Sequence, residues 1–131
     1  MSADLVLELS ATTTGLRSCL DRIRESCARS KLPRDTASRL QIVVEELFSN
    51  TVKYGYGGEC ERPVRLRLRC SPRVELVYED AAPPFDPTAW QETPLPPDDV
   101  GRKGIVLVRG LAESVRYEKL REGNRLTLRF A

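Results

Sequence analysis

Residues 40–56 read LQIVVEELFSNTVKYGY, and most of this stretch is typical of an amphipathic helix. Apolar residues and one threonine recur in it at spacings of three and four, the period of one helix face. They are Leu40, Val43, Val44, Leu47, Phe48 and Thr51. On another side of the same helix, Glu46 and Asn50 lie four residues apart and therefore project as neighbours. The stretch predicts a helix with one buried face and one carboxylate–carboxamide pair.

The Glu46–Asn50 pair has chemistry suited to a hydrated divalent cation. A carboxamide supplies a neutral oxygen ligand, and a carboxylate supplies either a ligand or a general base. Two solvated side chains would give the same pattern, so the pair gains meaning only from residues elsewhere in the chain. The neighbouring Glu45 points about 100° away around the helix, and we expect it to face solvent or a partner.

Length and composition exclude several classes of protein. A chain of 131 residues predicts one domain with its own core. Charged residues make up 31% of it but the formal net charge is only +2, so neither nucleic acid nor a membrane surface is indicated as a partner. The N-terminal sequence MSADLVLEL has no basic region followed by a long apolar run, so we expect no signal peptide and no transmembrane helix.

The cysteines and the absence of histidine narrow the chemistry further. The four cysteines form no C-x-x-C pair, and the chain has no histidine, so a structural zinc site is not expected. We interpret the cysteines as reduced thiols in a cytoplasmic protein. Nucleophiles activated by histidine, and phosphorylation on the chain's own histidine, are excluded. Any phosphoryl transfer must therefore use a carboxylate base.

The rest of the chain divides into short elements. We predict a strand at residues 4–9 and a helix from a cap at Thr12–Thr14 to about Arg29. Asp35 is expected to cap the second helix, and Gly55, followed by two further glycines, to end it. Strands are predicted at residues 64–70, 74–80, 113–119 and 125–130, with Glu122-Gly123-Asn124 as the last turn.

Alternation along the strands separates their two faces. In residues 64–70 the arginines Arg65, Arg67 and Arg69 alternate with apolar residues, which predicts a strand with one arginine-lined face in water. Asp80 has the parity of the apolar residues of its strand and stands where that strand ends. Asn124 has the inward parity of the last strand. Two polar residues are therefore expected on the core side of the sheet.

A proline-rich segment and a glycine loop separate these strands. The prolines of residues 81–99 are Pro83, Pro84, Pro87, Pro94, Pro96 and Pro97, too many for a helix or a central strand. A loop this long in a compact domain is usually functional. Gly101 and Gly104 then precede a helical run, with Arg102 and Lys103 between them, and backbone N–H groups at such a junction can receive phosphates. An ordinary loop-to-helix junction would look similar.

This order of elements predicts an α+β fold: a two-layer α/β sandwich in which helices cover one face of a mixed sheet. Glu46, Asn50, Asp80 and the glycine loop would converge between the helices and the sheet. The proline-rich segment would cover that space.

At this point the motifs resemble those of the GHKL ATPase (Bergerat) family. Four features occur in the same order as in that family and extend over nearly the whole chain. They are E-x-x-x-N on a helix, D-x-x-x-x-F-D-P after a strand, G-x-x-G before a helix, and a closing hairpin. The nearest likeness is to the anti-sigma-factor serine kinases of partner-switching systems, the RsbW and SpoIIAB type. The resemblance implies a histidine-kinase-like ATPase domain over residues 1–131, with ATP or ADP and Mg²⁺ as cofactors.

The resemblance also implies roles for individual residues. Glu46 would be the catalytic base, Asn50 the Mg²⁺ ligand, and Asp80 the acceptor of the adenine amino group. The stretch between Ala81 and Val100 would be an ATP lid. The remaining nucleotide-binding positions would be Lys53, Tyr54, Phe85, Gly101, Arg102, Lys103, Gly104, Ile105, Val106 and Asn124.

Three positions depart from the family's pattern. Ala82 stands where the family usually has glycine, and can tighten the adenine site or weaken nucleotide affinity. Tyr54 stands where relatives often have histidine, and Asn124 where they often have threonine. Asparagine still forms hydrogen bonds, so the three main polar roles remain in place.

The function that the resemblance implies is a protein serine/threonine kinase of a partner switch. It would phosphorylate a small STAS-type anti-anti-sigma protein, sequester a sigma factor or another regulator, and form a homodimer. Two alternatives stay open: a nucleotide-binding interaction module without phosphoryl transfer, and an ATPase or kinase core of a larger sensor. The arginine-lined strand face and the first helix, with Arg17, Arg22 and Arg24, are candidate partner surfaces, and solvation explains them equally well.

Overall fold

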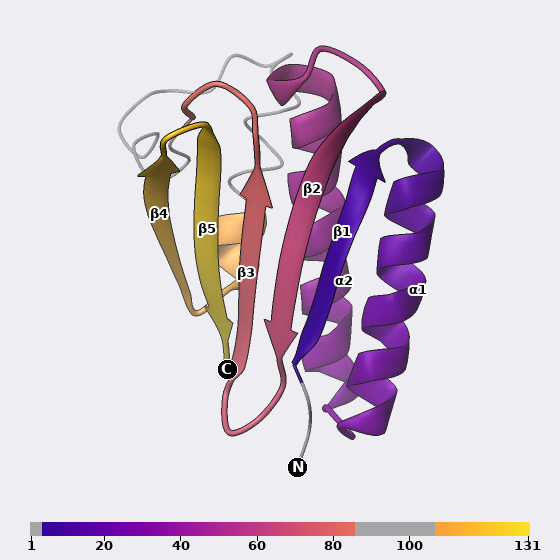
Figure 1. Ribbon diagram of the computed structural model, residues 1–131. Coiled ribbons are helices and arrows are strands. Elements are labelled where there is room, and N and C mark those ends of the chain that lie inside the picture. Colours follow the sequence, from indigo (N-terminus) through magenta and orange to yellow (C-terminus); the bar gives the residue numbers. More distant parts are fainter. Residues whose placement is uncertain (1–3, 86–106) are drawn as a thin grey trace.

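The computed structural model describes residues 4–85 and 107–131 and has an α+β architecture of two layers. A five-stranded sheet forms one layer, and two long helices cover one of its faces (Figure 1). The predicted α/β sandwich with helices on one face is confirmed. The predictions for the proline-rich segment beyond Phe85 and for the glycine loop at residues 101–104 fall outside the described residues.

The sheet has the order β1-β2-β3-β5-β4. Its strands are β1 (Leu5–Ala11), β2 (Cys60–Arg69), β3 (Val74–Asp80), β4 (Ser114–Leu120) and β5 (Gly123–Phe130). All of its described pairings are antiparallel, so the predicted mixed sheet is wrong.

The connections explain why no described pair is parallel. Two helices, not one, separate β1 from β2, so the chain returns to the sheet in the opposite direction; a single crossover helix would have made the pair parallel. β3 and β4 run in the same direction, but β5 lies between them (Figure 1).

The helices begin for different local reasons. Helix α1 (Thr13–Arg29) has Thr12 as its N-cap, whose hydroxyl accepts a hydrogen bond from the Gly15 N–H. Helix α2 (Arg34–Asn50) follows Pro33, which forms no side-chain cap. Asp35 was expected to cap this helix, but it lies within the first turn and binds Arg39, four residues on, at 2.9 Å. Pro33 at the cap position restricts the backbone and so fixes the direction in which the chain enters α2.

Helix α2 continues as a π-helical turn, η1 (Thr51–Gly55). The Tyr56 N–H bonds the carbonyl of Thr51 at 2.7 Å, which is the i→i+5 spacing of a π-helix. The helical stretch predicted in the sequence therefore ends in a wider turn. Such turns occur often at functional sites.

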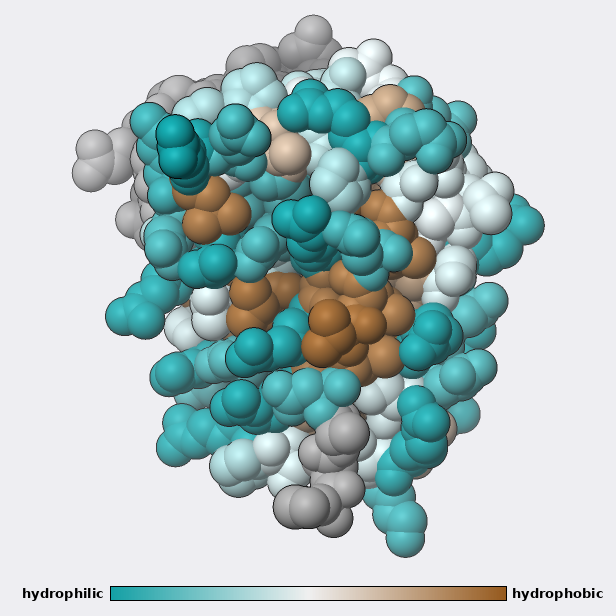
Figure 2. Space-filling view, in the orientation of Figure 1, coloured by the Kyte–Doolittle hydropathy of each residue, from teal (hydrophilic) through white to brown (hydrophobic). Residues whose placement is uncertain are grey.

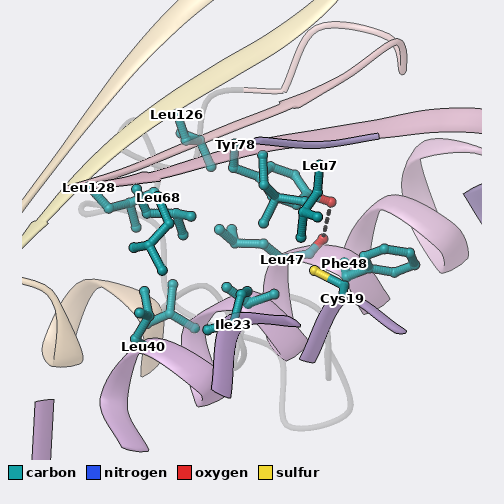
Figure 3. Packing of buried hydrophobic residues seen from close by; sticks show 14 of the residues in the cluster. Leu7, Cys19, Ile23, Leu40, Leu47, Phe48, Leu68, Tyr78, Leu126 and Leu128 are labelled. Carbon is teal, nitrogen blue, oxygen red and sulfur yellow. Dashed lines mark hydrogen bonds between the residues drawn. The ribbon is translucent and has the colours of Figure 1, made fainter. Parts of the chain in front are cut away.

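The core lies between the helices and the sheet (Figure 3). Every residue of the predicted apolar face of α2 is buried, including Leu40, Phe48 and Thr51. Leu66, Leu68, Leu76 and Leu128 meet them from the sheet, as the strand alternation predicts. Each such side chain contributes about 1.5–3 kcal/mol when fully removed from water.

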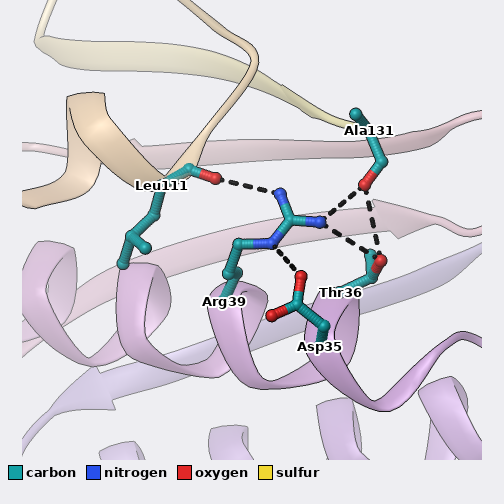
Figure 4. A network of polar contacts seen from close by, with 5 residues as sticks. All are labelled: Asp35, Thr36, Arg39, Leu111 and Ala131. Carbon is teal, nitrogen blue, oxygen red and sulfur yellow. Dashed lines mark hydrogen bonds and ion pairs between the residues drawn. The ribbon is translucent and has the colours of Figure 1, made fainter.

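Arg39 connects helix α2 to two segments that are distant in sequence, one at Leu111 and one at Ala131 (Figure 4). Its guanidinium donates to the carbonyl of Leu111 at 3.2 Å and to that of Ala131 at 2.7 Å, besides its bond to Asp35. Leu111 is the last residue of a helical segment that is described from residue 107 on, and its carbonyl would otherwise lack a partner within that segment. Arg39 therefore fixes that segment against α2 and the end of β5.

The opposite face of the sheet is open and mostly hydrophilic, with a patch of hydrophobic residues near its middle (Figure 2). The predicted exposure of Arg65, Arg67 and Arg69 is confirmed. Arginines of this face pair with nearby carboxylates: Arg65 with Glu8, Arg67 and Arg69 with Asp4, Arg125 with Glu79 and Glu118, and Arg129 with Glu75. Such exposed pairs stabilise a fold only slightly. In the described part of the chain, no helix is long and apolar enough to cross a membrane.

Candidate functional site

Asp80 is the centre of a polar cluster on the core side of the sheet. It ends β3 and pairs with Val64 on one side and Asn124 on the other. Its carboxylate Oδ1 accepts hydrogen bonds from Asn124 Nδ2 at 2.9 Å and from the Ala82 N–H at 3.2 Å. Its Oδ2 accepts one from the Thr51 hydroxyl at 2.8 Å. The inward orientation predicted from strand parity is thus confirmed.

Thr51 and Tyr78 connect this carboxylate to the helix layer. The Thr51 Oγ1 lies 2.6 Å from the Tyr78 hydroxyl, which also donates to the Leu47 carbonyl at 3.1 Å (Figure 3). Because the Thr51 hydrogen goes to Asp80, the Tyr78 hydrogen is shared between Thr51 and Leu47. Burial raises the pKa of Tyr78 well above its ordinary value, so its hydroxyl stays protonated.

Among the described residues, one acceptor direction of the Asp80 carboxylate has no hydrogen-bond partner. A carboxylate has about four lone-pair sites, and the described contacts use both of those on Oδ1 but only one on Oδ2. A Cβ added at Gly55 would lie 4.0 Å from Oδ2 and 2.8 Å from the Ala82 methyl. Gly55 therefore leaves room for Ala82 beside this oxygen. The arrangement suits one N–H donor of a ligand.

Glu46 and Asn50 lie on the same helix that brings Thr51 to Asp80. Asn50 is the residue before Thr51, and Glu46 is one turn earlier; both are half-buried, whereas Glu45 is exposed, as expected. The ion pairs within residues 4–85 and 107–131 involve other carboxylates, so Glu46 has no cationic partner there. Within the described residues, no ion pair therefore holds Glu46 away from a bound ligand.

The Asn50 side chain carries an unsatisfied buried atom. Its Nδ2 is buried and has no hydrogen-bond partner in the described part of the chain. An unpaired buried amide costs about 1–3 kcal/mol, so this position favours a ligand that supplies an acceptor or takes the amide oxygen after a flip of the group. Phosphate oxygens and a hydrated cation both meet that requirement.

The donors present fit a magnesium ion that is bound largely through a nucleotide. No cluster of three or more His, Cys, Asp or Glu residues that could hold a metal occurs in the described ranges. Mg²⁺ is usually held by one or two protein oxygens, with waters and substrate phosphates completing its shell. Asn50 could supply such an oxygen, with Glu46 one turn away.

The other predicted nucleotide-binding residues fall into three groups. Lys53 and Tyr54 are exposed on η1, Tyr54 by 62%, and neither contacts Asp80. Phe85 and Asn124 belong to the Asp80 cluster, since the Phe85 N–H bonds Asn124 Oδ1 at 2.9 Å. Gly101, Arg102, Lys103, Gly104, Ile105 and Val106 lie outside the described residues.

Several residues of the cluster were not predicted from the sequence. The helical period assigned Thr51 to the apolar face, and Tyr78 has the parity of the apolar residues of its strand. Tyr56 was not singled out, yet its hydroxyl bridges the Pro63 carbonyl and the Ala81 N–H, each at 2.7 Å. The available signal was the hydroxyl groups themselves, since a buried hydroxyl requires a partner.

Comparisons with known proteins identify the family of the domain and a structural neighbour. The sequence profile of the histidine kinase-like ATPase domain matches residues 9–130. The structure resembles the RsbU and RsbW domains of Rv1364c from Mycobacterium tuberculosis, with a TM-score of 0.69 and 18% sequence identity; the match covers 98% of this chain and 32% of that one. At this identity the likeness shows the fold. No curated protein sequence is significantly similar.

The profile extends from β1 to the last residue of β5 and so includes every residue of the Asp80 cluster, together with Glu46 and Asn50. The expected Bergerat-type fold is confirmed by the sheet, the two covering helices and the structural neighbour. The chain belongs to the histidine kinase-like ATPase domain family.

Proposed function

We propose that the chain binds MgATP and transfers the γ-phosphoryl group to a serine or threonine of a small STAS-type protein. The observation that carries this proposal is the Asp80 carboxylate: Thr51 and Asn124 hold it in one orientation, and no described residue occupies one acceptor direction of Oδ2. An acceptor-only group selects an amino group, such as that of adenine, over a carbonyl at the same place. ADP would bind the same site.

The chain's own residues then divide the work of transfer. Asn50 would offer its amide oxygen to Mg²⁺, which supplies charge neutralisation on the phosphates when it is bound. Glu46 would accept the proton of the attacking hydroxyl as its oxygen bonds to phosphorus and the bond to the β-phosphate oxygen breaks. The chain has no histidine, so a carboxylate is the conventional base that remains.

A partner switch is the proposed setting for this activity. The family match and the likeness to a chain that contains an RsbW domain support it. The unphosphorylated STAS-type protein and a second regulator, a sigma factor or another protein, would compete for this chain. Phosphorylation of the STAS-type protein would release it and leave the second regulator bound. A homodimer in the cytoplasm remains part of the proposal.

The test is transfer of label from γ-labelled ATP, with Mg²⁺, to a STAS-type protein of the same genome. Glu46→Gln should bind ATP like the wild type and transfer label about 10²–10⁴-fold more slowly, because it has lost the base. Glu45→Gln removes the exposed neighbouring carboxylate and should transfer at the wild-type rate. Equal transfer by Glu46→Gln would refute the assigned base. ATP binding without transfer by the wild type to any such protein would favour a nucleotide-binding module.

A further inference from the structure

The segment that follows Asp80 is held by side chains rather than by a strand. The backbone of Ala81 is fixed on both sides: its N–H donates to the Tyr56 hydroxyl at 2.7 Å, and its carbonyl accepts from Arg62 Nη2 at 2.7 Å. The Arg62 guanidinium also lies over the Tyr56 ring, 4.6 Å from its centroid. These contacts fix the start of the segment next to the candidate site.

Asn124 fixes the next residues of the same segment. Its Oδ1 accepts hydrogen bonds from the Phe85 N–H at 2.9 Å and from the Tyr117 hydroxyl at 2.6 Å. Its Nδ2 faces three acceptors: Asp80 Oδ1 at 2.9 Å, and the carbonyls of Pro83 and Ala82 at 3.1 and 3.2 Å. A backbone N–H can only donate, so Phe85 determines which end of the amide is the oxygen.

These contacts use the full hydrogen-bonding capacity of the Asn124 side chain. Two donors occupy the two lone pairs of its oxygen, and three acceptors surround the two hydrogens of its nitrogen. The residue is also only 8% exposed. It has no group left with which to bind a nucleotide directly. The sequence had suggested a nucleotide-binding residue at this position.

We infer that Asn124 is a positioning residue, which raises nucleotide affinity through the Asp80 carboxylate and the backbone of residues 82–85 without touching the base. This inference rests on the proposed nucleotide site. The Asn124 and Ala82 donors occupy Oδ1 of Asp80, so the carboxylate cannot rotate without losing them, and its open acceptor direction stays on Oδ2. The cost of ordering this segment is met during folding, before any ligand binds.

The isosteric pair Asn124→Thr and Asn124→Val tests the inference. The threonine hydroxyl can donate to Asp80 and accept from the Phe85 N–H, whereas valine can do neither. In ligand-free Asn124→Val, amide hydrogen exchange at Phe85, measured by NMR, should be about tenfold faster, and the Kd for MgATP, measured by calorimetry, should rise about tenfold. Asn124→Thr should restore part of both effects. At saturating ATP the rate of label transfer should be unchanged.

Tyr117→Phe is the matched control. It removes one donor from Asn124 Oδ1 and leaves every Nδ2 contact in place, so the Kd for MgATP should stay within about twofold of the wild type. If Asn124→Val does not fold, Asn124→Ala decides in its place, because alanine also lacks any hydrogen-bonding group and adds no branched side chain, and it should weaken binding as valine does.

The outcomes separate this inference from the proposed function. A wild-type protein that bound no MgATP would overturn both. A wild type that bound MgATP, with Asn124→Val or Asn124→Ala binding it equally well, would overturn the positioning role alone. Weaker MgATP binding with unchanged amide hydrogen exchange at Phe85 would also overturn the positioning role. Asn124 would then act by direct contact with the nucleotide and not through residues 82–85.

Discussion

Thr51 is the residue that joins the helix layer to the sheet at the candidate site. A single hydroxyl donates to Asp80 and accepts from Tyr78, so one side chain links η1 to β3 inside the core. Hydrogen bonds to a charged group contribute about 1.5–3 kcal/mol each. Together with Asn124 on β5, Thr51 gives Asp80 a fixed orientation before any ligand binds.

Gly55 and Ala82 form a second contact at the residue scale, and it predicts a compensating pair. In Gly55→Ala, the new methyl would approach the Ala82 methyl to 2.8 Å, and we expect a loss of about 1–3 kcal/mol of unfolding free energy and weaker MgATP binding. Adding Ala82→Gly removes the opposing methyl and should restore most of both losses. Urea unfolding and calorimetry measure them. A double variant no better than Gly55→Ala would contradict the proposed contact.

At the scale of elements, the π-helical turn η1 decides which residues reach the site. It follows α2 directly and brings Thr51 toward the sheet, while Lys53 and Tyr54 remain exposed. The segment after η1 contacts the start of α1. There Glu59 accepts a hydrogen bond from the Thr13 N–H at 2.5 Å. A carboxylate there also interacts favourably with the helix dipole.

The Glu59 contact predicts a pH dependence. The hydrogen bond from the Thr13 N–H lowers the pKa of Glu59 in the folded protein. Its stabilising effect is therefore fully present above the unfolded-state pKa of about 4.3 and is lost as the pH falls through the folded-state pKa. Glu59→Gln should be less stable than the wild type in urea at neutral pH and nearly equal to it in acid. Glu61→Gln, another exposed carboxylate of this region, is the control. A difference between wild type and Glu59→Gln that did not depend on pH would contradict this account.

The elements also show what the sequence could and could not predict. The 3.6-residue period of α2 and the alternation of β3 were sufficient to place Leu40, Phe48 and Asp80 correctly, because burial follows from periodicity. The π-helical turn has no comparable signal, since its spacing depends on one extra residue held by tertiary contacts. The antiparallel pairing was not predicted because the relative direction of two strands depends on how the whole connection between them crosses the sheet. Thr51 was placed correctly, but its hydrogen bonds to Asp80 and Tyr78 were not predicted, because a buried threonine and a small apolar residue give the same pattern.

At the scale of the whole molecule, one face of the sheet bears the core and the candidate site, and the other bears paired charges. The buried side includes Cys19 and Cys27, whereas Cys60 and Cys70 are half-buried. Burial raises the pKa of Cys19 to about 12, and burial with the nearby Cys70 raises that of Cys27 to about 11. The two buried thiols are therefore almost entirely protonated at neutral pH.

This difference predicts an order of thiol modification. At pH 8 only about one in a thousand Cys27 thiols, and fewer of Cys19, would be ionised. With Ellman's reagent, Cys60 and Cys70 of the native protein should react first, and Cys19 and Cys27 only after unfolding in guanidinium. Mass spectrometry of the modified peptides identifies the order. Early modification of Cys19 in the native protein would contradict the packing of α1 against the sheet.

The central claim is that this fold binds a nucleotide through Asp80, and calorimetric titration with MgATP tests it most directly. The wild type should bind, and Asp80→Asn should raise the Kd at least about tenfold, because it removes the charged acceptor and disturbs its contacts with Thr51 and Asn124. Glu79→Gln alters the adjacent carboxylate, which pairs with Arg125 on the open face of the sheet, and should bind like the wild type. Equal Kd values for the wild type and a folded Asp80→Asn would contradict the claim.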